Sequence, residues 1–136
     1  MAKRFGFGKK ERLKSKKAIE ALFTKGKTLS QFPLRVMYVF ETVQNEQDAI
    51  VQAGVTASKK HFKKAVDRNR IKRLLRECYR LQKLQLIETV KQKKLKAHLF
   101  FMFVDKILPE FNAVKEAMNK CLIQLQKAAE KHESVA

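Results

Sequence analysis

The segment from Arg68 to Leu81 has two faces of opposite character, and no other feature constrains the fold as strongly. At helical spacing, its apolar residues gather on one side, which a sheet or another helix must cover: Ile71, Leu74, Leu75, Cys78 and Leu81. The opposite side is polar and consists of Arg68, Asn69, Lys72, Arg73, Arg76 and Arg80. Arg70 lies at the flank, where its stem can pack while its guanidinium reaches outward. The chain must therefore hold a long amphipathic helix against its core and leave a basic side open.

Positive charge extends beyond this helix. The stretch from Ser58 to Arg80 contains ten Lys or Arg residues and two acids, Asp67 and Glu77. A solvated helix face usually mixes signs, because like charges one turn apart destabilise it. The whole chain of 136 residues has a formal net charge of +18. Since self-repulsion of this size weakens a compact state, the composition indicates an anionic partner, either nucleic acid or an acidic membrane surface.

Two features of the basic helix favour nucleic acid over a membrane. Arginine predominates on its polar side, and guanidinium groups recognise phosphates by paired hydrogen bonds. Its apolar side is required by the core and is not free to enter lipid. Asn69 adds a neutral donor and acceptor suited to a sugar hydroxyl or a base edge, and Lys59, Lys60, Lys63 and Lys64 extend the basic surface ahead of the helix. We therefore expect binding to a folded nucleic acid, with structured RNA preferred.

A first helix is expected near the N-terminus. Ser15 is a favourable N-cap, and Gly26 is a natural stop after Lys25. The apolar residues between them recur at helical spacing and form one face: Ala18, Ile19, Leu22 and Phe23.

The rest of the chain predicts a small sheet and two further helices. Segments 32–43 and 49–57 are rich in β-branched and aromatic residues, and the short polar link between them predicts an antiparallel hairpin. The basic helix is expected over 62–85, and the apolar run 97–104 predicts a strand buried on both faces. Pro109 then opens a final helix with an apolar stripe. The order α-β-β-α-β-α predicts an α/β (α+β) sandwich around one central sheet.

Length and composition predict one domain. We expect a basic N-terminal arm over 1–14, a single domain over 15–131 and a frayed tail over 132–136. Two distant cysteines, Cys78 and Cys121, are expected to be reduced and mostly buried. No apolar run reaches the roughly 18 residues of a membrane span, and the N-terminus lacks the apolar run of a secretory signal. These features predict a soluble, cytoplasmic protein.

The residue inventory does not predict an enzyme that acts alone. The chain has no paired-carboxylate motif, no His-Cys arrangement and no glycine-rich phosphate loop, and its three histidines lack metal-ligand spacing. A DNA-binding module would need a helix-turn-helix or a dimer seam, and the charged connector and buried strand after the basic helix argue against both. A general structured-RNA binder, such as a ribosomal protein or an RNA chaperone, stays open.

Two segments resemble the protein subunit of bacterial ribonuclease P. They read ERLKSKKAIEALFTKGK over 11–27 and GVTASKKHFKKAVDRNRIKRLLRE over 54–77, and the second contains the family's Arg-Asn-Arg signature at 68–70. The resemblance runs in register over about 7–125. It implies the ribonuclease P protein fold, also called ribosomal protein S5 domain 2-like, with a left-handed β-α-β crossover through the basic helix. Periodicity alone cannot give this hand, because right-handed crossovers are the default.

The resemblance also implies a function. An RNA subunit would hydrolyse precursor tRNA with magnesium ions and remove the 5′ leader, while the protein would have no catalytic residues and bind no cofactor by itself. The protein would be a monomer, one per catalytic RNA. By the same resemblance, the basic surface would bind the RNA subunit through Arg68, Asn69, Arg70, Lys72, Arg73, Arg76, Arg80, Lys59, Lys60 and Lys64.

A second site implied by the resemblance is a cleft between the first helix and the sheet, which would bind the leader. Its residues would be Ile19, Phe23, Arg35, Met37 and Ser58. Ile19 departs from the aromatic residue common at its position, so it would make apolar contact rather than stack. Phe23 would stack on bases, with core packing as its alternative role. Strand alternation puts Arg35 and Met37 on the opposite side from Leu34, Val36 and Tyr38. The resemblance implies that Arg35, Met37 and Val39 face the cleft and that the other three face the core, and a one-residue slip would exchange these sets.

Overall fold

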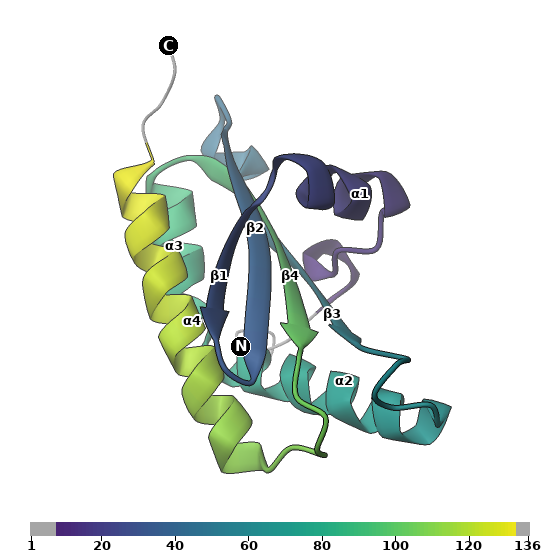
Figure 1. Ribbon diagram of the computed structural model, residues 1–136. Coiled ribbons are helices and arrows are strands. Elements are labelled where there is room, and N and C mark those ends of the chain that lie inside the picture. Colours follow the sequence, from purple (N-terminus) through teal and green to yellow (C-terminus); the bar gives the residue numbers. More distant parts are fainter. Residues whose placement is uncertain (1–7, 133–136) are drawn as a thin grey trace.

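A computed structural model describes residues 8–132 of the chain (Figure 1). Its helices and strands follow in the order α1 (Lys16–Lys25), β1 (Lys27–Gln31), β2 (Leu34–Thr42), β3 (Ile50–Ala57), α2 (Ala65–Gln82), α3 (Leu84–Gln92), β4 (Leu95–Phe103) and α4 (Phe111–Lys131). Short 3₁₀ helices at Lys9–Glu11 and Glu46–Asp48 complete the described part. The predicted order is confirmed, with β1 and α3 as additions.

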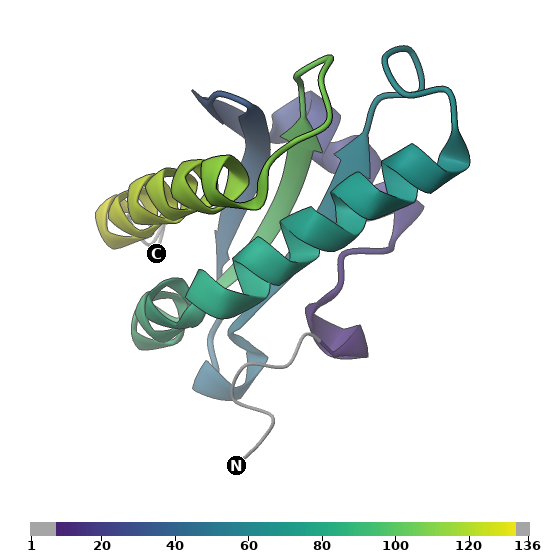
Figure 2. The same ribbon diagram turned by 90° about the horizontal axis from the view of Figure 1, so that it is seen from below.

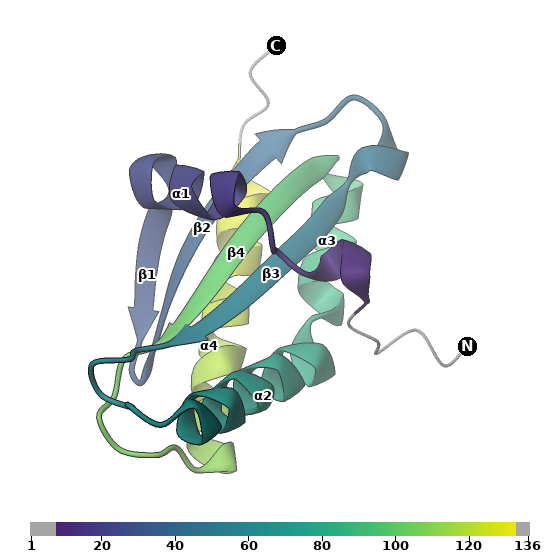
Figure 3. The same ribbon diagram turned by 90° about the vertical axis from the view of Figure 1, so that its right-hand side faces the viewer.

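The strands form one mixed sheet in the order β1-β2-β4-β3. Neighbours β1 and β2, and likewise β2 and β4, are antiparallel, whereas β3 and β4 are parallel. Helix α1 lies on one face, and α2, α3 and α4 lie on the other (Figures 1 and 3). In Figure 3, seen from the α1 side, the chain leaves β3, passes behind the sheet through α2 and α3, and returns beside β3 as β4. This crossover is left-handed, opposite to the usual hand.

The expected hairpin between segments 32–43 and 49–57 is wrong. Strand β2 pairs instead with β1 on one side and β4 on the other, and β3 pairs with β4. The physical reason lies in β4, whose residues alternate between fully buried and half-buried. A buried strand must pair the backbone N–H and C=O groups of both its edges, so β4 takes a place between β2 and β3.

Two apolar layers hold the domain together. The main core lies between the sheet and helices α2, α3 and α4, with Leu34, Val36, Leu99 and Phe101 among its fully buried residues. A smaller cluster lies under α1 and centres on Leu13, Leu22 and Met37. The faces predicted for the residues of β2 are confirmed, because Leu34 and Val36 join the main core while Met37 and Val39 join the α1 cluster.

Local details explain where α1 begins and ends. The Ser15 hydroxyl accepts a hydrogen bond from the Ala18 N–H at 3.3 Å, as an N-cap does. At the other end a Cβ on Gly26 would lie 2.5 Å from the Leu22 carbonyl oxygen, so a side chain does not fit. The chain therefore turns directly from α1 into β1.

The basic helix is shorter than expected, because α2 ends at Gln82 and α3 follows after Lys83. Its apolar face is confirmed at Ile71, Leu75 and Cys78, all fully buried. Leu81 is wrong as a core residue, because it lies in the last turn of α2 and is 41% exposed. Both cysteines are buried and reduced, as expected. Within the described part of the chain, no helix has the length and apolar character needed to cross a bilayer.

Candidate nucleic-acid interface

Helix α2 runs along the lower part of the molecule (Figures 1 and 2), and its polar side is the side not buried against the core. Asn69, Arg70 and Arg73 are exposed, and Lys72 and Arg76 are half-buried. The buried positions Ile71 and Leu75 fix the rotation of the helix, because they pack under the sheet. The geometry therefore presents amide and guanidinium groups on one surface of a rigid element.

A loop ahead of α2 carries further cations. The Arg68 guanidinium Nη1 donates to the carbonyl oxygens of Phe62 at 2.7 Å and Lys63 at 2.8 Å. The Ser58 hydroxyl accepts from the Lys60 N–H at 3.1 Å. In this structure Arg68 and Ser58 thus fix the loop 58–64, which exposes Lys59, Lys60, Lys63 and Lys64 beside the start of α2.

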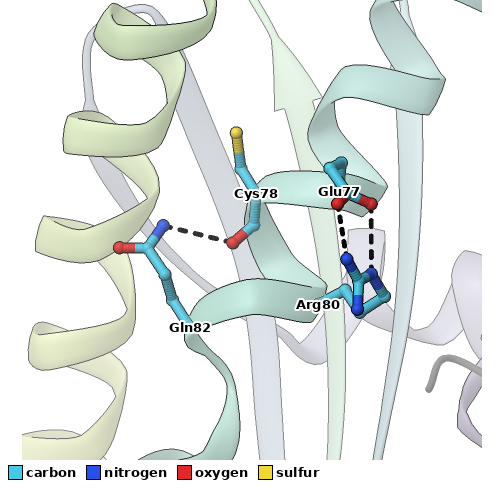
Figure 4. Close-up of polar contacts among 4 residues, drawn as sticks. All are labelled: Glu77, Cys78, Arg80 and Gln82. Atoms are coloured by element: carbon cyan, nitrogen blue, oxygen red, sulfur yellow. Dashed lines mark hydrogen bonds and ion pairs between the residues drawn. The ribbon is translucent and has the colours of Figure 1, made fainter. Parts of the chain in front are cut away.

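Arg80, at the other end of the basic face, is locally neutralised (Figure 4). Its Nη2 atom lies 2.5 Å from Oε1 of Glu77, and its Nε donates to Oε2 at 3.1 Å. This hydrogen bond lowers the pKa of Glu77 and raises the pKa of Arg80, so the charged pair is favoured. The structure gives Arg80 a carboxylate partner, which sets it apart from the cations nearer the start of α2.

Arg76 connects α2 to the opposite side of the sheet. Burial lowers the pKa of Arg76, and the nearby positive charge of Arg12 lowers it further. The N-terminal segment reaches this position by a backbone bridge from Arg12 to Ala53 at the free edge of β3. A hollow of about 280 Å³, the junction hollow, is lined here by Arg12, Leu13, Lys14, Ile19, Ala53, Gly54, Val55, Arg76 and Phe100. It joins the basic face of α2 to the face covered by α1.

On the α1 side, Phe23 is the exposed aromatic residue. Its side chain is 60% exposed, and its ring meets Phe100 edge-to-face with centroids 6.1 Å apart. Core packing of Phe23, the alternative role, is therefore not what the structure shows. Ile19 is half-buried and lines the junction hollow.

The strand residues of the expected cleft divide into covered and open positions. Met37 is only 8% exposed because it packs in the cluster under α1. Arg35 is exposed and lies beside Met102 of β4, which in turn lies beside Thr56 of β3. An open strip of the sheet thus runs from Arg35 towards the loop that holds Ser58.

Phe100, Met102 and Arg12 were not expected at this site. Phe100 and Met102 sit in the apolar run 97–104, which was interpreted as uniformly core, although the alternation of sheet residues already divides it between two faces. Arg12 reaches Arg76 only through the fold, so no local signal marks it.

The described residues do not form a metal site. Nowhere in residues 8–132 do three or more His, Cys, Asp or Glu side chains come together in a group that could hold an ion.

The left-handed crossover and the exposed basic face of its helix indicate a class of protein, small α+β proteins that bind nucleic acid. The family model described as Ribonuclease P matches residues 7–126. The chain belongs to the family of ribonuclease P protein components, which are subunits of an endoribonuclease. Membership favours the ribonuclease P interpretation over that of a general structured-RNA binder.

Individual relatives agree with this assignment. The chain is 40% identical over 121 residues to the ribonuclease P protein component of Porphyromonas gingivalis strain ATCC 33277, which covers 89% of this chain and 87% of the relative. It is 36% identical over 78 residues to that of Nitrosococcus oceani, covering 57% of this chain and 61% of the relative. A solved structure of a Staphylococcus aureus RNase P protein mutant with defective mRNA degradation activity aligns with a TM-score of 0.64 at 19% identity, covering 88% and 90% of the two chains. A Staphylococcus aureus RNase P protein aligns with a TM-score of 0.54 at 20% identity, covering 93% and 94%. These likenesses show the shared fold.

Proposed function

We propose that this protein binds the RNA subunit of ribonuclease P through α2. We propose further that it binds the 5′ leader of precursor tRNA on the side of the sheet where α1 lies. The observation that carries the proposal is the position of Arg76, which belongs to the basic face of α2 and also lines the junction hollow with Ile19 and Phe100. One continuous surface can thus contact a folded RNA and a single strand that leaves it.

The basic face supplies phosphate contacts. Lys59, Lys60 and Lys64 on the ordered loop, with Arg70 and Arg73 on α2, are exposed. Each cation placed on a phosphate releases condensed counterions, which gives affinity that falls with salt. Asn69 lies among them and can donate to or accept from a sugar hydroxyl.

The α1 side supplies contacts suited to an unpaired strand. The exposed ring of Phe23 offers a stacking surface, and Arg35 offers a guanidinium for a backbone phosphate. Met37 is buried under α1, so it supports this face from inside the apolar cluster. Binding here would favour precursor tRNA over mature tRNA, which lacks a leader.

The protein would position RNA and leave the chemistry to the RNA subunit. Magnesium ions held by that RNA would activate the water that cleaves the phosphodiester. The cations of α2 would lower the repulsion between RNA phosphates around those ions, so that less free magnesium is needed. We further propose a single domain, one protein per RNA and a cytoplasmic location.

The test is cleavage of precursor tRNA by the matching catalytic RNA at low magnesium, with and without this protein. The expected result is that the protein restores cleavage at the mature 5′ end. Binding to the catalytic RNA without any change in rate would contradict the proposal and leave a general structured-RNA binder.

A further inference from the structure

The connection between β4 and α4 exposes large apolar side chains. Ile107 is 72% exposed, Leu108 is 42% exposed and Phe111, the first residue of α4, is 40% exposed. Helix α2 passes beside the start of α4 and contacts it (Figure 2). The apolar connection therefore lies beside the basic helix and not under it.

A hollow of about 340 Å³ lies between these elements, and we name it the base pocket. It is lined by Arg70, Arg73, Leu74, Glu77, Pro109 and Phe111. The size falls within the range of small-ligand sites. The position lies on the flank of α2, separate from the junction hollow, which Arg76 lines.

The lining combines an apolar floor with cations. Pro109, Leu74 and the Phe111 ring provide the floor, and the guanidinium groups of Arg70 and Arg73 are exposed above it. The Lys115 ammonium lies 5.9 Å from the centroid of the Phe111 ring. The one acid of the lining, Glu77, is already paired with Arg80.

This combination matches one chemical class of occupant. A nucleotide within a strand has a base that is flat and apolar on its faces and a phosphate on each side of its sugar, so it satisfies the ring and the cations together. An apolar peptide would fill the floor but leave the guanidinium groups without anions. A base within a duplex is stacked between neighbours, so only an unpaired, extruded base can enter.

We propose that the base pocket binds one unstacked nucleobase of a structured RNA, with its ring against Phe111 and its flanking phosphates on Arg70 and Arg73. The inference rests on the proposed function only in taking RNA as the partner of α2. It adds a contact to a base to a surface that otherwise recognises the backbone.

The experiment compares two short hairpin RNAs that differ by a single unpaired uridine bulged from the stem. The wild-type protein is expected to bind the bulged hairpin about 5- to 100-fold more tightly, the range typical of one stacked base. Phe111→Leu keeps an apolar side chain but removes the ring, so it should reduce this ratio towards one and leave affinity for the paired hairpin unchanged. Phe111→Tyr should retain the ratio.

Phe32→Leu is the matched control, because Phe32 is 73% exposed, lies between β1 and β2 and lines a different hollow that shares no residue with the base pocket. It should retain the wild-type ratio. Photocrosslinking from 5-iodouridine at the bulge should attach to Phe111 in the wild-type protein.

Equal affinity of the wild-type protein for both hairpins would overturn the proposal, as would a ratio that Phe111→Leu leaves intact. The hairpin assay contains neither catalytic RNA nor precursor tRNA. A protein that prefers the bulge but fails to promote cleavage would therefore contradict the proposed function and support the base pocket.

Discussion

The ammonium nitrogen of Lys83 lies 2.6 Å from Oε1 of Glu11 and ties the N-terminal segment to the junction of α2 and α3. The Lys83 side chain is 1% exposed, and the Glu11 side chain is 27% exposed. Lys83 also lies 6.0 Å from the centroid of the Tyr79 ring, at the C-terminal end of the basic helix. A buried charge thus connects the end of α2 to the segment that carries Arg12 towards Arg76.

Removing the carboxylate of this pair should destabilise the protein more than removing the buried charge of Lys83. Glu11→Ala leaves the Lys83 ammonium buried with less compensation, and we expect a loss of about 1–3 kcal/mol of unfolding free energy. Lys83→Met keeps the length of the side chain without its charge, so we expect a smaller loss. Urea unfolding of both variants measures the difference. A larger loss of unfolding free energy for Lys83→Met than for Glu11→Ala would contradict this account of the pair.

Gly54 allows the N-terminal segment to lie close to the sheet. A Cβ at this position would be 3.0 Å from Cδ1 of Phe100 and 3.1 Å from the carbonyl oxygen of Leu13. Gly54→Ala should therefore destabilise the protein by about 1–3 kcal/mol, because the backbone atom cannot move aside cheaply. Gly8→Ala is the control: no atom lies within 4 Å of its added Cβ, so its effect should stay within about 0.5 kcal/mol. Thermal unfolding that ranks the two equally would contradict this account.

Burial raises the pKa of both thiols, of Cys78 to about 11 and of Cys121 to about 12. The unfolded chain has thiol pKa values near 8.5, so between roughly pH 8.5 and 11 it releases protons that the folded state retains. The unfolding free energy should therefore fall as pH rises through this window, by up to about 1.4 kcal/mol per pH unit for each thiol. Urea unfolding at pH 7.5 and 9.5 should show the fall. The Cys78→Ala, Cys121→Ala double variant should reduce this fall in unfolding free energy. An unchanged fall would show that the thiols do not cause it.

The spacing of apolar residues was sufficient to predict the elements in which that spacing repeats regularly. The apolar face of α2 follows directly from the spacing of Ile71, Leu75 and Cys78, and the alternation of β2 gave the correct faces for Val36 and Met37. Strand β1 was missed because KTLSQ has one large apolar residue, Leu29, which is common at a sheet edge. A local pattern carries no information on which strands pair, and so the hairpin was wrong.

The site was predictable where it is formed by one element and not where several meet. The cations of α2 are adjacent in the sequence, so their shared face could be derived. Arg12 and Arg76 meet only because the N-terminal segment pairs with β3, and Phe111 meets Arg70 only because α4 starts beside α2. The Glu77–Arg80 pair has helical i,i+3 spacing and could have been anticipated.

The salt dependence of RNA binding should distinguish the open cations of α2 from the paired one. Arg73→Ala removes an exposed guanidinium and should flatten the plot of log affinity against log salt by about one unit. Arg80→Ala should change the slope less, because Arg80 is held by Glu77. Lys127→Ala, an exposed cation near the end of α4, is the control and should leave the slope unchanged. Equal slopes for all variants would argue against phosphate contacts on α2.

Phe23 should contribute to the affinity for precursor tRNA and not to the affinity for mature tRNA. Its 60% exposed ring has Phe100 on one side only, so Phe23→Ala removes a stacking surface and little core packing. We expect affinity of the ribonucleoprotein for precursor tRNA to fall about 5- to 100-fold, the usual range for one base–aromatic contact. Affinity for mature tRNA, which has no leader, should stay the same. Phe32→Ala removes a ring that is 73% exposed at the other end of β1 from α1, and it should affect neither affinity. Equal losses for both tRNAs in Phe23→Ala would contradict leader binding on this face.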